Sequence, residues 1–164
     1  MTKKRRRGTA IVETSKGILV TSGRKRVFIL PGGEANKGES RMQGAIRELR
    51  EETGLVAYDT KYLFSYVGSK HKTFSGKHYF RDHHKVFLIK AKGKVRPRHE
   101  VKHIAYYKPG NDVRISHATK SIIDRYYKWK ERREREREEK DRFFTVHEQS
   151  PSNYSKSCGG NLKY

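Results

Sequence analysis

The sequence predicts an α+β fold, in which a mixed β-sheet is covered by helices on its faces. Two observations support this fold class. Several segments alternate apolar and polar residues or are rich in β-branched and aromatic residues, and glycine or proline turns separate them, as is typical of strands. Two helical patterns lie among these segments, so that strands, a helix, more strands and a second helix follow one another along the chain.

The expected strands are short and end at turn residues. The segment at residues 26–30 runs into Pro31, Gly32 and Gly33, and the segment at residues 101–107 is closed by Pro109 and Gly110. Residues 56–67 are long enough for one or two strands. The complete set of expected strands lies at residues 8–14, 16–21, 26–30, 56–67, 85–91 and 101–107.

The first expected helix, at residues 41–53, has both of its ends marked in the sequence. Ser40 is a suitable N-cap, and Gln43 three positions later completes a capping box. Gly54 stands where a helix end favours a left-handed residue. A second helix is expected to begin near Ser116 and to continue through Tyr126 towards the charged segment.

The distribution of charge divides the chain into four parts. Residues 1–7 are expected to form a disordered basic arm, and residues 8–129 carry the periodic patterns of one folded domain. Residues 130–142 are almost all charged and are expected to extend the second helix, since opposite charges recur four residues apart. Residues 143–164 are polar and turn-rich, which favours a disordered tail.

Composition restricts the partners and the compartment. The formal net charge of +21 attracts polyanions such as nucleotides and nucleic acids. The single cysteine, Cys158, excludes a disulfide within the chain, so a reducing cytoplasm is the expected location. The apolar runs are too short to cross a bilayer, and no secretory signal follows the basic N-terminus, so no membrane contact is expected.

Three glutamates gather on one side of the first expected helix. At about 100° per residue, Glu51 and Glu52 fall on either side of Glu48, beside the apolar stripe that faces the sheet. Like charges at this spacing repel each other, so the arrangement favours a bound divalent cation. Hard carboxylate ligands suit Mg²⁺, with Mn²⁺ as an alternative. Arg47 is close enough on the helix to orient Glu51.

The spacing of these residues resembles the Nudix box. The resemblance covers residues 33–55, and every fixed position of the motif is present. It implies a Nudix-type αβα sandwich and the hydrolysis of a nucleoside diphosphate linked to another group, X. The motif residues are Gly33, Glu39, Arg47, Glu48, Glu51, Glu52 and Gly54.

The resemblance also implies roles for individual residues. Glu48, Glu51 and Glu52 would bind the metal, and a backbone carbonyl of Gly32 or Gly33 would join them. Arg47 would position a glutamate. The metal would neutralise the diphosphate and activate the water that attacks phosphorus.

The general base is left open between two possibilities. It is a glutamate of the box, with Glu51 and Glu52 as the catalytic candidates, or a carboxylate on a later loop. Glu100 is the later candidate, because it stands just before the expected strand at residues 101–107.

Histidines and aromatic residues between positions 65 and 85 are expected to lie in a polar loop. The spacing of the four histidines in this region matches no standard zinc pattern. In proteins similar to the Nudix family this region often shapes the substrate pocket. The resemblance therefore makes Tyr66, His71, Phe74 and Tyr79 candidates for contact with a nucleotide base.

Two further functions are alternatives to nucleotide hydrolysis. The first is an enzyme that hydrolyses the 5′ end of RNA, a pyrophosphohydrolase or decapping-type enzyme, with the basic arms in contact with the RNA. The second is a regulator that binds a nucleotide without cleaving it, against which the complete set of box acids argues. The sequence predicts neither the group X nor the oligomeric state.

Overall fold

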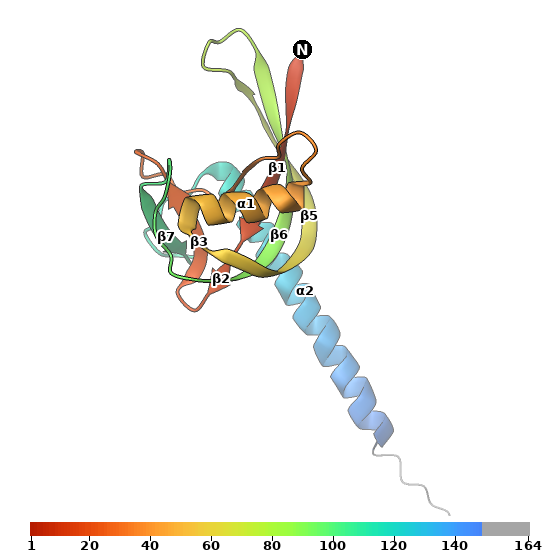
Figure 1. Ribbon diagram of the computed structural model, residues 1–164. Helices are drawn as coiled ribbons and strands as arrows, with labels where there is room; N and C mark the ends of the chain where they lie inside the picture. Colours follow the sequence, from red (N-terminus) through yellow and green to blue (C-terminus); the bar gives the residue numbers. More distant parts are fainter. Residues whose placement is uncertain (149–164) are drawn as a thin grey trace, which may run out of the picture. The chain divides into compact units, whose positions relative to one another are not determined.

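The computed structural model describes residues 1–148 of the chain (Figure 1). Two α-helices and seven β-strands account for most of this part. In chain order the elements are β1 (Thr2–Ile11), β2 (Glu13–Thr14), β3 (Gly17–Ser22), β4 (Gly32–Glu34), α1 (Arg41–Thr53), β5 (Val56–Lys72), β6 (Tyr79–Lys92), β7 (His103–Tyr107) and α2 (His117–Glu148).

The strands form two sheets. The larger sheet has the order β4-β1-β6-β5, in which β1 runs parallel to β6 and antiparallel to β4, so the sheet is mixed. The smaller sheet has the order β2-β3-β7 and is antiparallel. Mixed pairing together with flanking helices confirms the predicted α+β class.

The core lies between α1 and the larger sheet. Ala45 and Leu49 of α1 are fully buried, and they pack with Phe87 and Ile89 of β6. Met42 of the same helix is 40% exposed and does not belong to the buried cluster. The buried residues of this cluster are Ala10, Val12, Leu19, Ala45, Leu49, Leu55, Phe87 and Ile89.

Close approach of α1 to the sheet depends on Gly8 of β1. A Cβ atom at this position would overlap the carbonyl oxygen of Arg41 at the start of the helix. The missing side chain therefore lets the N-terminal end of α1 lie directly on β1, and α1 in turn places its acidic residues beside β4.

Most expected strands are present, with different lengths. Residues 56–67 belong to a single long strand, β5, whose register against β6 shifts at three irregular points. The expected strand at residues 26–30 is wrong, because this segment makes only isolated bridges, from Ile29 to Thr21 and from Phe28 to Ile115.

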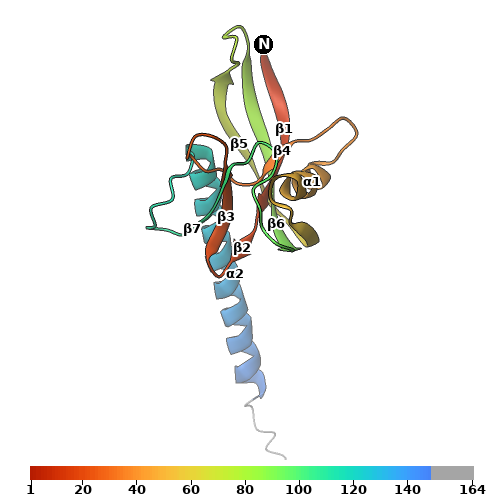
Figure 2. The same cartoon turned by 60° about the vertical axis from the view of Figure 1, so that its left-hand side comes forward.

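The predicted disordered arm at residues 1–7 is also wrong. Residues 2–7 form the first part of β1 and pair in parallel register with β6, from Thr2 opposite Tyr79 to Arg7 opposite His84. The ends of β1, β5 and β6 lie side by side and extend beyond α1 (Figures 1 and 2). Partner strands therefore order a segment whose own composition favours disorder.

The second helix, α2, begins at His117 and continues to Glu148, so it contains the predicted charged extension at residues 130–142. The chain divides within this helix into two compact units, Met1–Tyr126 and Tyr127–Tyr164. Ile122, Ile123 and Tyr126 are buried in the first unit. In the second unit the Arg133 guanidinium lies 5.5 Å from the Trp129 ring centroid.

The predicted disordered tail overlaps the described part of the chain only at residues 143–148, which are helical and correct the prediction there. The remainder of that tail, with Cys158, lies outside the described residues. Within residues 1–148, neither helix combines the length and the apolar composition needed to cross a membrane.

Candidate active site

The helix that carries the box acids has the predicted caps. The Ser40 side chain accepts a hydrogen bond from the Gln43 N–H, and the Gln43 side chain accepts one from the Ser40 N–H. At the other end Gly54 has φ of 78° and its N–H donates to the carbonyl of Arg50. These caps fix the length of α1 and with it the positions of its glutamates.

Two of the predicted metal ligands meet at the glycine turn. Glu48 lies against Gly33, where a Cβ atom would come within 2.5 Å of the Glu48 Oε1 atom. Glu52 hydrogen-bonds to Glu48 and to the backbone of Gly32. The turn therefore forms a cradle for this pair of carboxylates, and it depends on the absence of a side chain at position 33.

The environment of Glu52 disfavours a negative charge. Its pKa is raised to about 8, first by burial and then by the neighbouring charge of Glu48. The hydrogen bond from Gly32 and the positive charge of Arg7 lower the pKa of Glu52, but they do not cancel the effects of burial and of Glu48. Two carboxylates this close are stabilised either by a shared proton or by a cation.

Arg47 organises the acids on the other side of the helix. Its Nε and Nη2 atoms donate to the two carboxylate oxygens of Glu39, at 2.9 and 3.0 Å. Its Nη1 atom donates to Glu48 at 3.0 Å and to Glu51 at 3.2 Å. Arg47 therefore contacts three glutamates, and its role in orienting one of them for catalysis stays a prediction.

The contact with Arg47 changes the pKa of Glu39. The hydrogen bond from Arg47 and another from the Asn36 backbone hold the pKa of Glu39 below its usual value. Glu39 therefore stays ionised and keeps the loop between β4 and α1 attached to the helix. Gly44 allows this approach, since a Cβ there would lie 3.2 Å from the Glu39 carboxylate.

Glu51 is not part of the carboxylate pair. Its side chain is 46% exposed and contacts Arg47, whereas Glu48 and Glu52 turn towards the glycine turn. Among the described residues, no three Asp, Glu, His or Cys side chains converge closely enough to form a ready metal site. The three-carboxylate arrangement is therefore not preassembled, and a metal-binding role for Glu51 stays a prediction.

The donors that do converge fit a hard divalent cation. Glu48 and Glu52 offer carboxylate oxygens, and the adjacent Gly32–Gly33 backbone offers peptide groups with no side chain in the way. Mg²⁺ is commonly held by one or two carboxylates while it keeps several water ligands, so a pair of acids is a sufficient protein contribution.

Arg7 joins the site although sequence reasoning did not include it. It stands opposite Glu34 in the pairing of β1 with β4, next to the Gly8–Gly33 pair. Its Nε atom is buried and has no hydrogen-bond partner among the described residues, and it lies 4.0 Å from Asp82. The only signal in the sequence is a run of basic residues, which a disordered arm would explain equally well.

The loop that carries Glu100 reaches the end of α1. The Arg98 N–H donates to the carbonyl of Glu52 at 3.0 Å, and the Arg96 N–H donates to that of Thr53 at 2.9 Å. A hollow of about 480 Å³ lies between this loop and the helix, lined by Arg47, Glu51, His99 and neighbouring residues. No hydrogen bond or ion pair joins Glu100 to the box acids within residues 1–148, so its role as a base stays a prediction.

The four candidate substrate contacts are spread along the hairpin of β5 and β6. Tyr66 lies 5.8 Å from the His84 ring, and His71 lies 5.5 Å from the Phe80 ring. Phe74 at the turn is fully exposed, and Tyr79 is contacted by Lys70. The predicted polar loop is therefore wrong, because only the turn between the strands is loop; contact of these residues with a base stays a prediction.

Fold and site together define a Nudix-type hydrolase, with a capped helix that presents acids beside a glycine turn on a mixed sheet. The NUDIX domain family model matches residues 3–129, and the chain belongs to the Nudix family. It is a pyrophosphohydrolase by class. Among curated proteins, no sequence gives a significant match.

Solved structures agree with this assignment. A protein assigned to the Nudix hydrolase family from Chromobacterium violaceum is 38% identical, with coverage of 78% of this chain and 79% of that chain and a TM-score of 0.63. The MutT Nudix hydrolase from Burkholderia pseudomallei is 18% identical (74% and 97% covered, TM-score 0.58). A bifunctional NMN adenylyltransferase/ADP-ribose pyrophosphatase from Francisella tularensis, complexed with AMP and a manganese ion, is also 18% identical (78% and 42% covered, TM-score 0.56). The last two show similarity of fold alone.

Proposed function

We propose that the protein hydrolyses a phosphoanhydride bond in a nucleoside diphosphate linked to X, such as a nucleoside triphosphate, and that it depends on Mg²⁺ or Mn²⁺. The observation that carries this proposal is the pair of carboxylates, Glu48 and Glu52, held together at the Gly32–Gly33 turn. A cytoplasmic location is part of the proposal and rests on the sequence alone.

Each residue of the site has a separate task in this proposal. Glu48 and Glu52 hold the cation, which when bound neutralises the diphosphate and makes a water molecule more acidic. Arg47 fixes Glu39, Glu48 and Glu51 in position through its hydrogen bonds. Arg7 provides a positive charge next to Glu52, at a place suited to a phosphate group.

The general base is proposed to be a box glutamate rather than Glu100. Arg47 holds the Oε2 atom of Glu51, and the side chain is 46% exposed, so its other oxygen, Oε1, is the atom that accepts a proton from water in this proposal. A variant Glu100→Gln separates the two possibilities. Turnover close to that of the wild type supports a box glutamate, whereas a loss of orders of magnitude at an unchanged melting temperature assigns the base to Glu100.

Replacement of Glu52 tests the proposal directly. Glu52→Gln is expected to lower the turnover of nucleoside triphosphates by about a hundredfold or more, because the amide cannot replace a carboxylate as a ligand for Mg²⁺. Phosphate and pyrophosphate release would be measured with Mg²⁺ and with Mn²⁺, over triphosphates, oxidised triphosphates, ADP-ribose and dinucleoside polyphosphates. The matched control is Asp112→Asn, which changes an exposed acid outside the site.

The same variant can contradict the proposal. Glu52→Gln removes an unfavourable buried acid, so the folded state is expected to remain at least as stable as the wild type. A stable Glu52→Gln protein with wild-type turnover would rule out the assigned cation site. Nucleotide binding by the wild type without any product, for all these substrates and both metals, would favour the non-catalytic regulator.

A further inference from the structure

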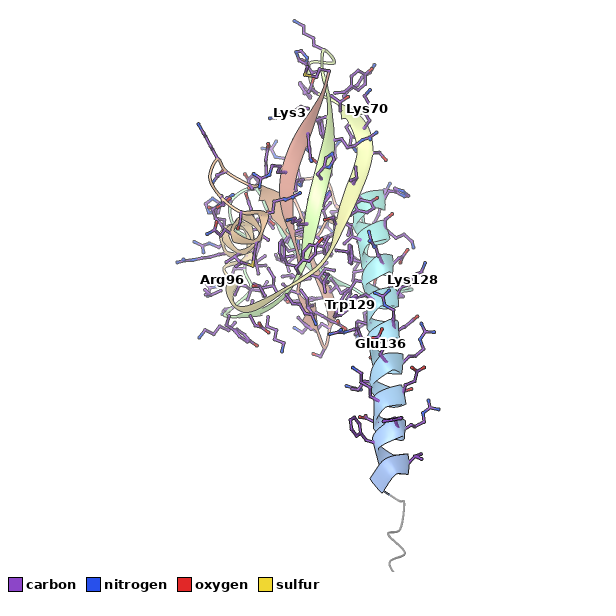
Figure 3. The ribbon with its side chains drawn as sticks, turned by 90° about the vertical axis from the view of Figure 1, so that its right-hand side faces the viewer. Lys3, Lys70, Arg96, Lys128, Trp129 and Glu136 are labelled. Carbon is purple, nitrogen blue, oxygen red and sulfur yellow. The ribbon has the colours of Figure 1, made fainter. Side chains whose placement is uncertain are left out.

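Three strand ends form a strongly basic part of the larger sheet, which we call the extension. It consists of residues 2–7 of β1, 67–72 of β5 and 79–84 of β6, held together by the strand pairing. Lys3 of β1 and Lys70 of β5 lie at the same end of these strands (Figure 3). Its Lys and Arg residues are Lys3, Lys4, Arg5, Arg6, Arg7, Lys70, Lys72 and Arg81, and its only acid is Asp82.

Strand register separates the charges onto two faces. Lys4 and Lys70 both stand opposite Arg81, and residues opposite each other in register share a face of the sheet. Asp82 belongs to the other face, where it receives hydrogen bonds from Arg5 at 2.7 and 3.0 Å. The face with Lys4, Lys70 and Arg81, here called the basic face, therefore has no acid of the extension to neutralise it.

Aromatic side chains accompany the cations. The Tyr79 ring lies 4.5 Å from Lys70 Nζ on the basic face. On the other face a groove of about 750 Å³ is lined by Phe74 and Phe80 together with Lys3, Arg5 and neighbouring residues. Exposed rings among cations on an open sheet suit single-stranded nucleic acid, whose bases stack while its phosphates pair with Lys and Arg.

Both faces lead towards the candidate active site. On the basic face, Arg41 at the start of α1 donates from Nη1 to the His83 carbonyl at 3.4 Å, so the face ends at the box helix. On the other face, Glu34 lines the groove and is bound by Lys3 at 3.7 Å, and it directly follows Gly33 of the carboxylate cradle. A strand bound along the extension would therefore run towards the helix that carries Glu48 and Glu52.

We propose that the extension binds single-stranded nucleic acid and directs its 5′ end into the site, so that the group X is a polynucleotide. The proposal rests on the proposed function for the chemistry at that end, but not for the binding itself. Its basis is the unneutralised basic face, the Tyr79 ring on that face and the contact of that face with α1.

The test is binding of labelled strands by the full-length protein. Fluorescence anisotropy would be measured with a 3′-labelled 5′-triphosphate RNA of about 12 nucleotides, the DNA of the same sequence and the corresponding RNA duplex. The variant Lys4→Gln/Lys70→Gln/Lys72→Gln removes three exposed charges from the basic face. The control Lys92→Gln/Lys102→Gln/Lys108→Gln removes three exposed charges elsewhere in the first unit, so both proteins have the same net charge.

The first variant is expected to bind single strands about tenfold or more weakly. The slope of the logarithm of its binding constant against the logarithm of the salt concentration should be smaller in magnitude by about two than in the wild type. The control should stay near the wild type. Tyr79→Leu, which changes no charge and removes the ring from the basic face, is expected to weaken binding about fivefold or more through lost stacking. Tighter binding of RNA than of DNA would identify RNA as the preferred ligand, and equal binding would extend the proposal to both.

Equal losses in the two triple variants would overturn the proposal, because bulk charge would then explain the binding. Absence of single-strand binding by the wild type, or a preference for the duplex, would overturn it too. Hydrolysis of the strand and of nucleoside triphosphates is measured separately. Strand binding that needs the basic face, with cleavage of triphosphates but not of the strand, would overturn the assignment of X to a polynucleotide and leave the proposed function in place. Absence of hydrolysis of both substrates would refute the proposed function and leave the docking surface in place.

Discussion

At the scale of single residues, the site requires a residue without a side chain at position 33. The carboxylate of Glu48 occupies the space that a side chain at position 33 would fill. Sequence reasoning identified Gly33 and Glu48 through the motif, and the structure gives the physical reason for their pairing. It could not identify Arg7, because a guanidinium has a specific role only where strand pairing buries it beside an acid.

Gly33→Ala tests this contact. The added methyl group would displace the flexible end of Glu48 and separate it from Glu52, so turnover is expected to fall about tenfold or more. The melting temperature should change little, because a side chain can move where backbone cannot. The control is Gly68→Ala, whose Cβ would meet no atom closer than 3.7 Å. Full activity of Gly33→Ala would show that the cradle does not position Glu48.

His84 gives the domain a pH-dependent stability. Burial, followed by the charge of Arg7, lowers the pKa of His84 to about 4, and Asp82 only partly opposes this shift. Because His84 binds a proton more readily in the unfolded chain than in the folded chain, its contribution to the free energy of unfolding falls as the pH decreases from about 6.5 towards 4. Between pH 7 and pH 5 this contribution alone is a loss on the order of 2 kcal/mol, whereas Glu52, with its raised pKa, contributes in the opposite direction.

Urea unfolding at both pH values, in the wild type and in His84→Gln, which cannot gain the proton, would give the His84 contribution as the difference between the two proteins. The variant should lose less stability between the two pH values than the wild type, and His117→Gln, which changes an exposed histidine, should follow the wild type. Parallel curves for His84→Gln and the wild type would assign the pH dependence to other groups.

At the scale of elements, predictions succeeded where the local sequence determines the structure. Ser40, Gln43 and Gly54 mark the ends of α1, and the capping bonds form as expected. Residues 2–7 and 26–30 were mispredicted because their state depends on partners far along the chain. The first segment becomes a strand through pairing with β6, and the second makes only isolated bridges despite its β-rich composition.

The contact between α1 and β1 is the element-level feature with the largest expected energetic effect. In Gly8→Ala the new Cβ would collide with backbone at Arg41, which cannot move without shifting the helix. The free energy of unfolding is expected to fall by roughly 3 kcal/mol. Gly23→Ala is the control, since its Cβ would lie 3.5 Å from the nearest atom. Chemical denaturation compares the two, and equal stability would contradict the tight contact.

At the scale of the whole molecule, the site and its supporting core belong to the first unit. The family match ends at residue 129, close to the division after Tyr126, which is itself buried and hydrogen-bonded to Glu13. The sequence indicated this boundary through the change from periodic to almost wholly charged residues. The extension was not foreseen, because an excess of positive charge by itself gives no indication of a sheet.

A chain of residues 1–129 is therefore expected to fold and to hydrolyse nucleotides with kcat/KM within roughly twofold of the full-length value. Circular dichroism during thermal unfolding and phosphate release would provide the comparison. A non-cooperative transition, or a large loss of kcat/KM in a folded protein, would show that residues after 129 contribute to the first unit. The division after Tyr126 would then not mark the end of the part of the chain that folds on its own.

The pairing of β1 with β6 from its second residue onwards has a practical consequence for work with this protein. Thr2 already stands opposite Tyr79, and Met1 lines the aromatic groove at the hairpin. An affinity tag fused in front of Met1 would add polypeptide directly at the mouth of that groove. Recombinant protein for substrate screening should therefore carry its tag at the C-terminus, or have an N-terminal tag removed without leaving extra residues.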